Sequence, residues 1–407
     1  MLSHPLERRN FIKLCAGMSA AFGGASLLST PAQTAPPLLQ QAQNKIDNLK
    51  IVDLKYLEMK FPGKLPVKWN SIIKSGGGTP GMTQMEIHTN QGIIGRSLPK
   101  GPRSVAEKIF KKIKGENPFF VERIWDRMYR ENRKPVAKGD YIKAMGSIDI
   151  AIWDIIGKAL GLPVYKVLGG FQSKVRVYAA GGYYREDKSI NDLADEMEGY
   201  VNDGFRAVKM KVGGADFNTD VERVRVVRET IGPDIDLLLD ANNKWYAYDA
   251  IRFGRAVEKF NPFWFEEPVV PDDFAGCAEV KNAIDIPIVA GENEYTRWGC
   301  RDLIVNNSAD ILNLDTVNAG GITEYRKIAS MASAFHIPVA PHGDPHMAVH
   351  LVASIPNALI METYPGVQSQ YNPALKLFPV KNGYIEVPNF PGIGIDPDPA
   401  DVKKYAK

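Results

Sequence analysis

The sequence has few cysteines and little net charge. Its three cysteines, Cys15, Cys277 and Cys300, are too few for a disulfide framework, and we expect Cys277 and Cys300 to be free thiols. The formal net charge of +3, without a clear stripe of lysine and arginine, predicts no nucleic-acid partner. The 407 residues suit a barrel-type catalytic domain of about 250 residues and a smaller partner domain.

No apolar run is long enough for a comfortable membrane span. The longest candidate, residues 14–28, follows Arg8-Arg9-Asn10-Phe11-Ile12-Lys13 and precedes small residues and prolines. This order is typical of a twin-arginine export signal. We therefore predict a signal over residues 1–36, a linker over 37–48, a periplasmic location and no stable membrane span after signal removal. The alternatives are an uncleaved anchor or a chance basic start.

Two glycine-rich nucleotide motifs are also missing. The loop at residues 75–81 is rich in glycine but lacks the Gly-Lys-Ser/Thr ending and the following helix of a phosphate cradle, so a mobile surface or lid loop is predicted there. No Gly-x-Gly-x-x-Gly follows the first strand of the C-terminal part, which disfavours a doubly wound dinucleotide-binding sheet.

The pattern of apolar residues divides the rest of the chain into two domains. Residues 49–172 read as an α+β capping domain, with strands at 51–60, 83–89 and 91–95 and helices at 104–114 and 143–160. Eight short apolar runs follow, most of them separated by amphipathic helical stretches; they are residues 175–180, 207–212, 236–241, 263–267, 286–290, 310–315, 337–340 and 358–362. Eight such units predict a closed β/α (TIM-type) barrel over 173–370, with residues 371–407 returning to the cap.

In a β/α barrel the chemistry lies at the C-terminal ends of the strands, and acidic residues stand at three of these ends. Glu266 follows Asp240 by 26 residues, and Glu292 follows Glu266 by 26. Carboxylates at one height on neighbouring strands would repel one another without a cation, and a site of oxygen ligands suits Mg²⁺. The pattern predicts a metal site. The alternative is that the three residues are unrelated surface acids at the starts of loops.

Two lysines and one histidine stand at other strand ends. Lys209 and Lys211, two residues apart on one strand, both point into the mouth, where each should lower the pKa of the other and allow one to act as a base. Asp315 ends the strand before His342 and can orient its imidazole. The alternatives are two solvated lysines and a histidine bonded to backbone.

Two other readings of these acids and histidines are disfavoured. His342, His346 and His350 are spaced by four as in a zinc helix, but Pro345 interrupts a continuous helix. A glycosidase pair at Glu266 and Glu267 is disfavoured because adjacent strand residues point to opposite faces.

Together these residues resemble the enolase superfamily, and within it the mandelate racemase subgroup with its acid-sugar dehydratases. The resemblance covers residues from about 50 to 395 and rests on Lys209-x-Lys211, Asp240, Glu266-Glu267-Pro268, Gly291-Glu292-Asn293, Asp315 with Gly320-Gly321, His342 and Glu362. Residues 151–154 and 162–170 also match the family's join between cap and barrel.

The resemblance implies a role for each of these positions. Asp240, Glu266 and Glu292 would bind Mg²⁺; Lys211 would be the base on one face of the substrate, and His342 with Asp315 would act on the other face. Lys209 would lie near the substrate carboxylate, and a protonated Glu362 would hydrogen-bond the enolate. Asn242 and His346, in the polar mouth, are the further substrate-binding candidates. The resemblance also suggests a homo-oligomer.

Three functions follow from this set. The first is dehydration of an acid sugar, an aldonate or aldarate, to a 2-keto-3-deoxy acid, with a small-molecule carboxylate as the partner. The second is racemisation or epimerisation of a 2-hydroxy acid or related carboxylate. The third is an exported sugar-acid-binding protein without catalysis. All three need the same carboxylate recognition, and only the first two use the proton-transfer groups.

Overall fold

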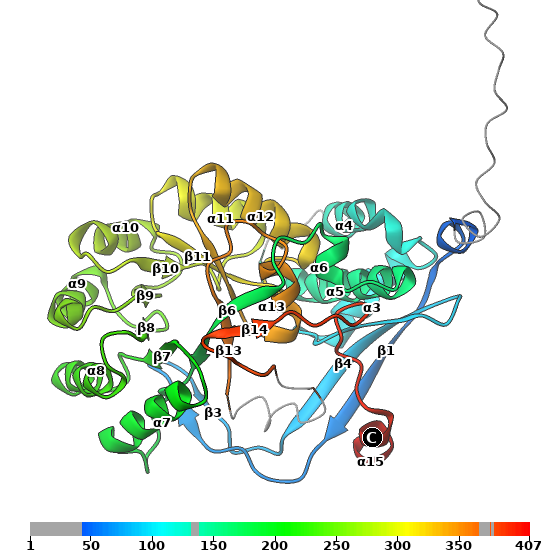
Figure 1. The fold of residues 1–407 in the computed structure, drawn as a ribbon. Coiled ribbons are helices and arrows are strands. Elements are labelled where there is room, and N and C mark those ends of the chain that lie inside the picture. Colours follow the sequence, from blue (N-terminus) through cyan, green and yellow to red (C-terminus); the bar gives the residue numbers. More distant parts are fainter. Residues whose placement is uncertain (1–42, 132–137, 366–374, 376–377) are drawn as a thin grey trace, which may run out of the picture. The chain divides into compact units, whose positions relative to one another are not determined.

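The C-terminal part of the chain forms a ring of eight parallel strands (Figure 1). They are β6 (Lys174–Ala180), β7 (Ala207–Lys211), β8 (Asp236–Asp240), β9 (Trp264–Glu266), β10 (Ile288–Ala290), β11 (Ile311–Asp315), β12 (Val339–His342) and β13 (Met361–Thr363). The strand order is β12-β11-β10-β9-β8-β7-β6-β13, and a parallel bridge between Val339 and Ala358 spans the gap that remains. The predicted β/α barrel is therefore confirmed, and its ring of strands is nearly closed.

The computed structural model describes residues 43–131, 138–365, 375 and 378–407. The predicted export signal lies outside these residues, as do residues 37–42 of the predicted linker and 371–374, 376 and 377 of the predicted C-terminal segment. Residues 48–407 form one compact unit, and residues 43–47, which precede it, are helical. Within the described ranges, no helix combines the length and the apolar composition needed to cross a membrane.

Helices alternate with the barrel strands and cover them from outside (Figure 1). They are α7 (Ile190–Asn202), α8 (Phe217–Ile231), α9 (Ala247–Val257), α10 (Phe274–Ala283), α11 (Thr296–Val305), α12 (Ile322–Ala334) and α13 (Pro345–Val352). The start of α7 shows how the sequence sets these boundaries, because Ser189 and Asp192 form a capping box there. Cys277 on α10 and Cys300 on α11 are buried free thiols, as predicted.

Alternation along each strand separates the core from the site. Val208 and Met210 of β7 pack in the cluster between strands and helices, together with Val224 of α8. Lys209 and Lys211 must then point to the other side, because successive residues of a strand face opposite directions. Inside the barrel, Tyr178 and other apolar residues form a separate packed cluster, and Lys209 lies next to it.

The N-terminal part forms a three-stranded antiparallel sheet with helices. The strands β1 (Ile51–Lys60), β4 (Gly81–Thr89) and β5 (Ile94–Ser97) lie in that order, and the helices are α3 (Arg103–Ile113), α4 (Val121–Arg130), α5 (Asp140–Leu160) and the short α6 (Val164–Val167). Helix α5 packs closely on β5, since a Cβ at Gly95 would lie 2.1 Å from the Ala151 carbonyl oxygen. Helix α4 was not predicted.

The predicted glycine-rich loop takes part in a small hairpin that reaches the barrel. Strands β2 (Lys68–Trp69) and β3 (Lys74–Ser75) pair with each other, and Trp69 also bridges to Tyr184 beyond β6. Ser71 at the hairpin turn donates to the Ala241 carbonyl oxygen at 2.5 Å. These contacts hold the hairpin against the strand ends.

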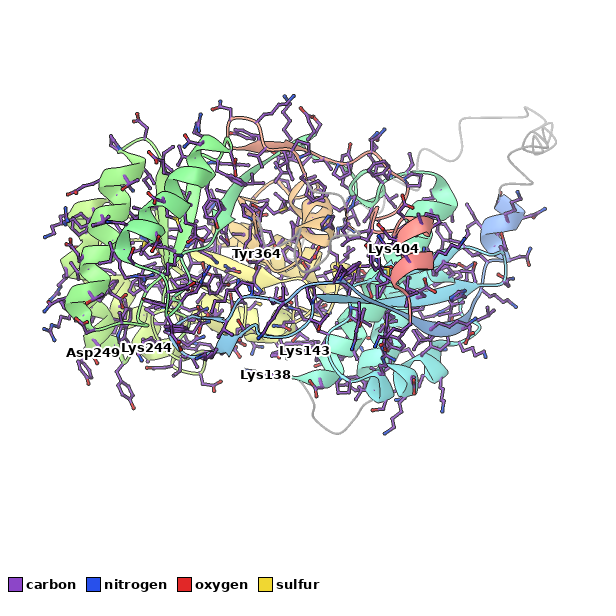
Figure 2. All side chains as sticks on the ribbon, turned by 90° about the horizontal axis from the view of Figure 1, so that it is seen from below. Lys138, Lys143, Lys244, Asp249, Tyr364 and Lys404 are labelled. Carbon is purple, nitrogen blue, oxygen red and sulfur yellow. The ribbon has the colours of Figure 1, made fainter. Side chains whose placement is uncertain are left out.

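Further contacts join the C-terminal segment and the cap to the rest of the unit. Strand β14 (Tyr384–Glu386) pairs antiparallel with β6, and α15 (Pro399–Tyr405) leads to a bridge between Ala406 and Met59 of β1. Lys138, labelled in Figure 2, lies 3.4 Å from the carboxylate of Glu294 beyond β10. The C-terminal segment is thus linked both to β6 of the barrel and to β1 of the cap, and Lys138 of the cap is linked to the loop after β10.

Candidate active site

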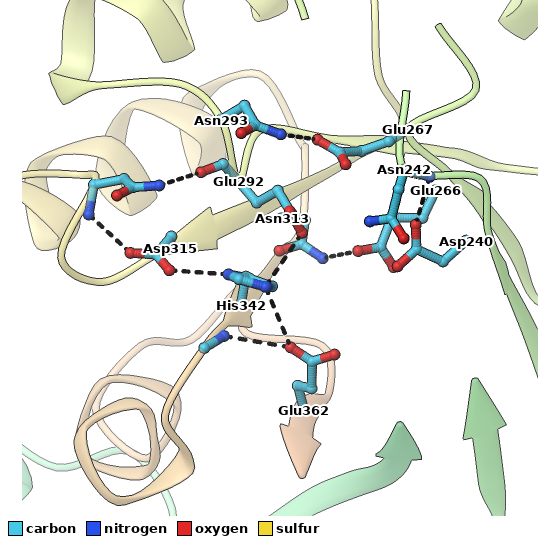
Figure 3. Close-up of polar contacts among 12 residues, drawn as sticks. Asp240, Asn242, Glu266, Glu267, Glu292, Asn293, Asn313, Asp315, His342 and Glu362 are labelled. Atoms are coloured by element: carbon cyan, nitrogen blue, oxygen red, sulfur yellow. Dashed lines mark hydrogen bonds and ion pairs between the residues drawn. The ribbon is translucent and has the colours of Figure 1, made fainter. Parts of the chain in front are cut away.

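The predicted site residues stand at the same level because the strands are in register. Lys211 is paired with Asp240 across β7 and β8, and Asp240 with Glu266 across β8 and β9. Asp315 is paired with His342 across β11 and β12. Figure 3 shows the side chains of Asp240, Glu266, Asp315 and His342 directed toward one region, with Asn313 between Glu266 and His342.

The carboxylates of Asp240 and Glu266 are buried and already engaged by the two lysines. Asp240 is ion-paired with Lys211 and lies 3.5 Å from Lys209. Glu266 accepts hydrogen bonds from Lys209 at 3.0 Å and from the side-chain amide of Asn313 at 2.9 Å. Across the described residues, no three His, Cys, Asp or Glu side chains are gathered as ligands around one point. A metal ion would therefore compete with the lysines for these oxygens.

The donor set nevertheless fits a hard divalent cation. Burial, and after it the nearby charge of Asp240, raise the pKa of Glu266 to about 8, so the ionised form of this carboxylate would gain from a nearby cation. Among the described residues Glu292 Oε2 is buried and accepts no hydrogen bond, and it faces His342 Nε2 at 3.4 Å in a long ion pair. Carboxylate oxygens are the ligands that Mg²⁺ takes in proteins. Asp240, Glu266 and Glu292 thus have the chemistry of the predicted metal site.

The pKa values of Lys209 and Lys211 are raised, whereas the sequence predicts lowered values. Lys209 is 1% exposed and contacts Glu266 and Glu362, the latter at 2.8 Å. Burial is the largest single influence on Lys211 and, with the repulsion from Lys209, acts to lower its pKa, but the charges of Asp240, Tyr183 and Glu266 together outweigh both, so the pKa is raised. Lys209 does act to lower the pKa of Lys211, as predicted, but the surrounding negative charges outweigh this effect. That one of the two lysines acts as a base stays a prediction.

His342 and Asp315 form the predicted pair. His342 Nδ1 lies 2.9 Å from Asp315 Oδ2, and the other oxygen of Asp315 accepts from the backbone N–H groups of Val317 and Asn318. Burial alone would lower the pKa of His342, but Glu292 and the hydrogen bond to Asp315 raise it to about 10. The imidazole is thus held charged, with Nε2 directed 3.4 Å from Glu292.

Glu362 lies beside this pair, as the strand order predicted. It contacts Lys209 and accepts a hydrogen bond of 2.6 Å from the hydroxyl of Tyr364, which is labelled in Figure 2. Burial acts to raise its pKa, but Lys209 and His342 outweigh burial and lower it to about 2. Two cations thus favour the ionised form of Glu362 in this arrangement, and the protonated Glu362 that the resemblance implies stays a prediction.

The two further substrate-binding candidates differ in their surroundings. Asn242 follows Asp240 in a left-handed conformation, φ 44°, and its side-chain oxygen is buried without a hydrogen-bond partner. Among the described residues this oxygen has no donor, so it could accept a hydrogen bond from a substrate hydroxyl group. His346 is buried at the start of α13, where its ring lies 3.1 Å from Asp344 and packs on Phe378.

The structure adds two lysines from the cap that the sequence did not single out. Lys100, in the loop after β5, lies 2.5 Å from Asp315 Oδ2. Lys68 of β2 stands over the ring of Tyr183, 3.9 Å from its centroid, and the Lys211 ammonium lies 5.1 Å from the same centroid. Burial, with the charge of Lys211, lowers the pKa of Lys68 to about 8. No sequence signal marks either lysine, because both come from another domain.

Asn313 could have been found from the sequence. It precedes Asp315 by two residues on β11, so both side chains lie on the inner face of the barrel. The same rule that placed Lys209 beside Lys211 therefore applies to Asn313.

Comparison with known proteins agrees with this geometry. The family model described as Enolase C-terminal domain-like matches residues 192–402, and the model for the Mandelate racemase / muconate lactonizing enzyme N-terminal domain matches residues 77–169. The chain is 33% identical to an arabinonate dehydratase of Saccharolobus solfataricus, over 76% of this chain and 86% of the relative. It is 33% identical to a 3,6-anhydro-alpha-L-galactonate cycloisomerase of Streptomyces coelicolor, over 72% of this chain and 82% of the relative.

Solved structures give the same result. The crystal structure of a racemase from Streptomyces coelicolor with bound magnesium has a TM-score of 0.78 and 28% identity, over 88% of this chain and 100% of that chain. The two family models fall on the cap and on the barrel with its C-terminal segment, and the larger match spans more than half of the chain. The chain therefore belongs to the enolase superfamily, in its mandelate racemase subgroup.

Proposed function

We propose that this chain removes the proton next to the carboxylate of a sugar acid, with Mg²⁺ bound, and that water then leaves to give a 2-keto-3-deoxy acid. One observation carries the proposal: two proton-transfer groups contact different members of one carboxylate set. Lys211 pairs with Asp240, and His342 Nε2 lies 3.4 Å from Glu292. A substrate carboxylate held at this set would have its neighbouring carbon between a lysine and a histidine.

The residues that would hold Mg²⁺ are Asp240, Glu266 and Glu292. The ion would supply Lewis-acid stabilisation of the negative charge that develops on the substrate carboxylate. The similarity to an arabinonate dehydratase and to a racemase crystallised with magnesium supports both the reaction and the metal.

The side chains of this protein have separate tasks in the reaction. Lys211 Nζ takes the proton at C2 in its neutral form, which requires the charge of Asp240 to be engaged elsewhere. Lys209 donates hydrogen bonds to the developing enolate, a stabilisation that is worth most in a buried site. His342, held by Asp315 at Nδ1, gives its proton from Nε2 to the leaving hydroxyl group.

Racemisation or epimerisation is the second candidate. It is favoured by the same two groups, because a proton removed at Lys211 and returned from His342 inverts C2. The racemase and cycloisomerase relatives support it. The reactions differ in one measurable way: inversion places solvent deuterium at C2 without loss of water.

The test is turnover of a panel of aldonic and aldaric acids by the mature protein with Mg²⁺, assayed for a 2-keto product. We expect turnover of at least one acid and its loss in Lys211→Ala and His342→Ala. Absence of turnover with every acid, from a folded sample that binds Mg²⁺, would contradict the dehydratase. Binding that survives both substitutions, with no C2 exchange in the parent, would favour an exported sugar-acid-binding protein.

We also propose that the chain is exported by the twin-arginine route to the periplasm and works there as a homo-oligomer. The support for export is the Arg8-Arg9 pair before a mildly apolar segment. The family resemblance supports the oligomer. Sedimentation of the mature protein tests the oligomer, and a monomer at micromolar concentration would contradict it.

A further inference from the structure

A cavity of about 260 Å³ lies between the cap and the barrel beside His342. The cap contributes residues 81–83 of β4 and 98–100 after β5, and the barrel contributes residues 315–317, His342, Asp344 and Met347. None of Asp240, Glu266 and Glu292 lines it. A substrate bound to those carboxylates through its own carboxylate would therefore extend its remaining carbons past His342 into this space.

The cation on the cap side of this cavity is already neutralised. Lys100 Nζ lies 2.5 Å from Asp315 Oδ2, and the same oxygen lies 2.9 Å from His342 Nδ1. An anion that approached Lys100 would meet the Asp315 carboxylate at nearly the same distance. Lys100 can still donate a hydrogen bond to a neutral hydroxyl group, because an ammonium has three donors.

The barrel side adds a negative charge. Asp344 is the N-cap of α13, where its side chain accepts a hydrogen bond of 2.8 Å from the His346 backbone N–H. This side chain lines the cavity and is 17% exposed. Its free lone pairs can accept from hydroxyl groups, whereas a second carboxylate would be repelled.

These charges select between the two kinds of sugar acid. Among the described lining residues the only lysine, Lys100, is ion-paired with Asp315, and Asp344 adds a carboxylate to the wall. A second carboxylate of the substrate would therefore meet a carboxylate and a lysine that is already paired. We infer that the cavity takes the hydroxylated chain of a sugar acid with a single carboxylate, an aldonate, and discriminates against a second carboxylate at the far end. A water-sized group occupies about 30 Å³, so the space suits a short polyhydroxylated chain. The inference rests on the proposed function and narrows its substrate class.

The experiment compares an aldonate with the aldarate of the same length and configuration. For the parent protein with Mg²⁺ we expect kcat/KM to favour the aldonate by about tenfold or more, the usual scale of a like-charge penalty. Asp344→Asn should shift this ratio toward the aldarate by about tenfold, because asparagine keeps the cap of α13 and removes the charge.

A matched control exists elsewhere in the chain. Asp398 is the N-cap of α15 and, like Asp344, precedes a proline and accepts from the backbone N–H two residues later. Asp398→Asn makes the same change in charge away from the cavity and should leave the ratio unchanged. A parent that prefers the aldarate, or an Asp344→Asn protein with an unchanged ratio, would overturn the inference.

Calorimetric binding separates this inference from the proposed function. If no acid of the panel is turned over, the proposed function fails, and titration of the matched aldonate and aldarate into the Mg²⁺-loaded protein decides the inference alone. Tighter binding of the aldonate supports the inferred discrimination against a second carboxylate, and tighter binding of the aldarate overturns that inference.

Discussion

Lys100 of the cap and Asp315 of the barrel are joined by an ion pair of 2.5 Å at the oxygen that also holds His342. Asp315 is 1% exposed, so this pair is shielded from solvent on the barrel side. The contact couples the seating of the cap to the orientation of His342. Lys100 is therefore a positioning residue for the proposed reaction.

Replacing Lys100 tests that coupling. Lys100→Met should slow the step that uses His342 by roughly tenfold, about 1.4 kcal/mol in activation free energy, because Asp315 loses one of its two cations. Exchange of the C2 proton on the Lys211 face should change much less. The measurement is deuterium exchange with each C2 epimer, and Lys108→Met on the exposed side of α3 is the control. Equal slowing on both faces would point to a general structural defect.

Metal binding can be measured without turnover. Mg²⁺ at about 100 times its dissociation constant should stabilise the folded parent by about 2.7 kcal/mol, seen as a rise in Tm, and a chelator should reverse it. Glu292→Gln should reduce this rise, because the amide removes the negative charge of one of the three predicted ligands. Glu279→Gln, on the exposed side of α10, should keep it. A Mg²⁺-dependent rise that survives Glu292→Gln in full would remove Glu292 from the ligand set.

The buried environment of His350 should make the stability of the protein depend on pH. Its Nδ1 accepts from the Tyr165 backbone N–H and its Nε2 donates to the Ile393 carbonyl oxygen, so the neutral form fits and burial lowers its pKa to about 4. Between pH 6.5 and 4, His350 binds a proton in the unfolded chain but stays largely neutral in the folded chain. The free energy of unfolding should therefore fall by about 3 kcal/mol between pH 6.5 and 4 from this residue alone.

Urea unfolding at pH 7.5, 5.5 and 4 measures this loss. His350→Gln should be less stable than the parent at pH 7.5 but should lose less stability on acidification. His336→Gln, at an exposed position after α12, should retain the parent's slope. An unchanged slope in His350→Gln would show that other groups carry the pH dependence.

Export is tested in cells. Replacing Arg8 and Arg9 together by lysine should retain the full-length precursor inside the cell, because the twin-arginine route requires the arginine pair. Fractionation with a tagged chain measures the distribution. Equal periplasmic amounts of parent and variant would contradict the proposed route.

The sequence by itself determined the barrel and the positions of its polar strand ends. Apolar runs of regular spacing specify parallel strands, and the two-residue period of a strand decides that Lys209 and Lys211 face inward while Met210 packs outward. Asp240 and Glu266 follow from the same rule. These features depend on local pattern and on a closure that few topologies allow.

Only the tertiary structure decided the ionisation of the site and the contribution of the cap. The pKa of Glu362 is lowered and that of Lys211 is raised by charges on other strands, whose distances no pattern in the sequence reveals. Lys100 reaches Asp315 across 215 residues of sequence, through the docking of one domain on another. Electrostatic energies vary steeply with distance and burial, so they follow from three-dimensional packing and not from residue order.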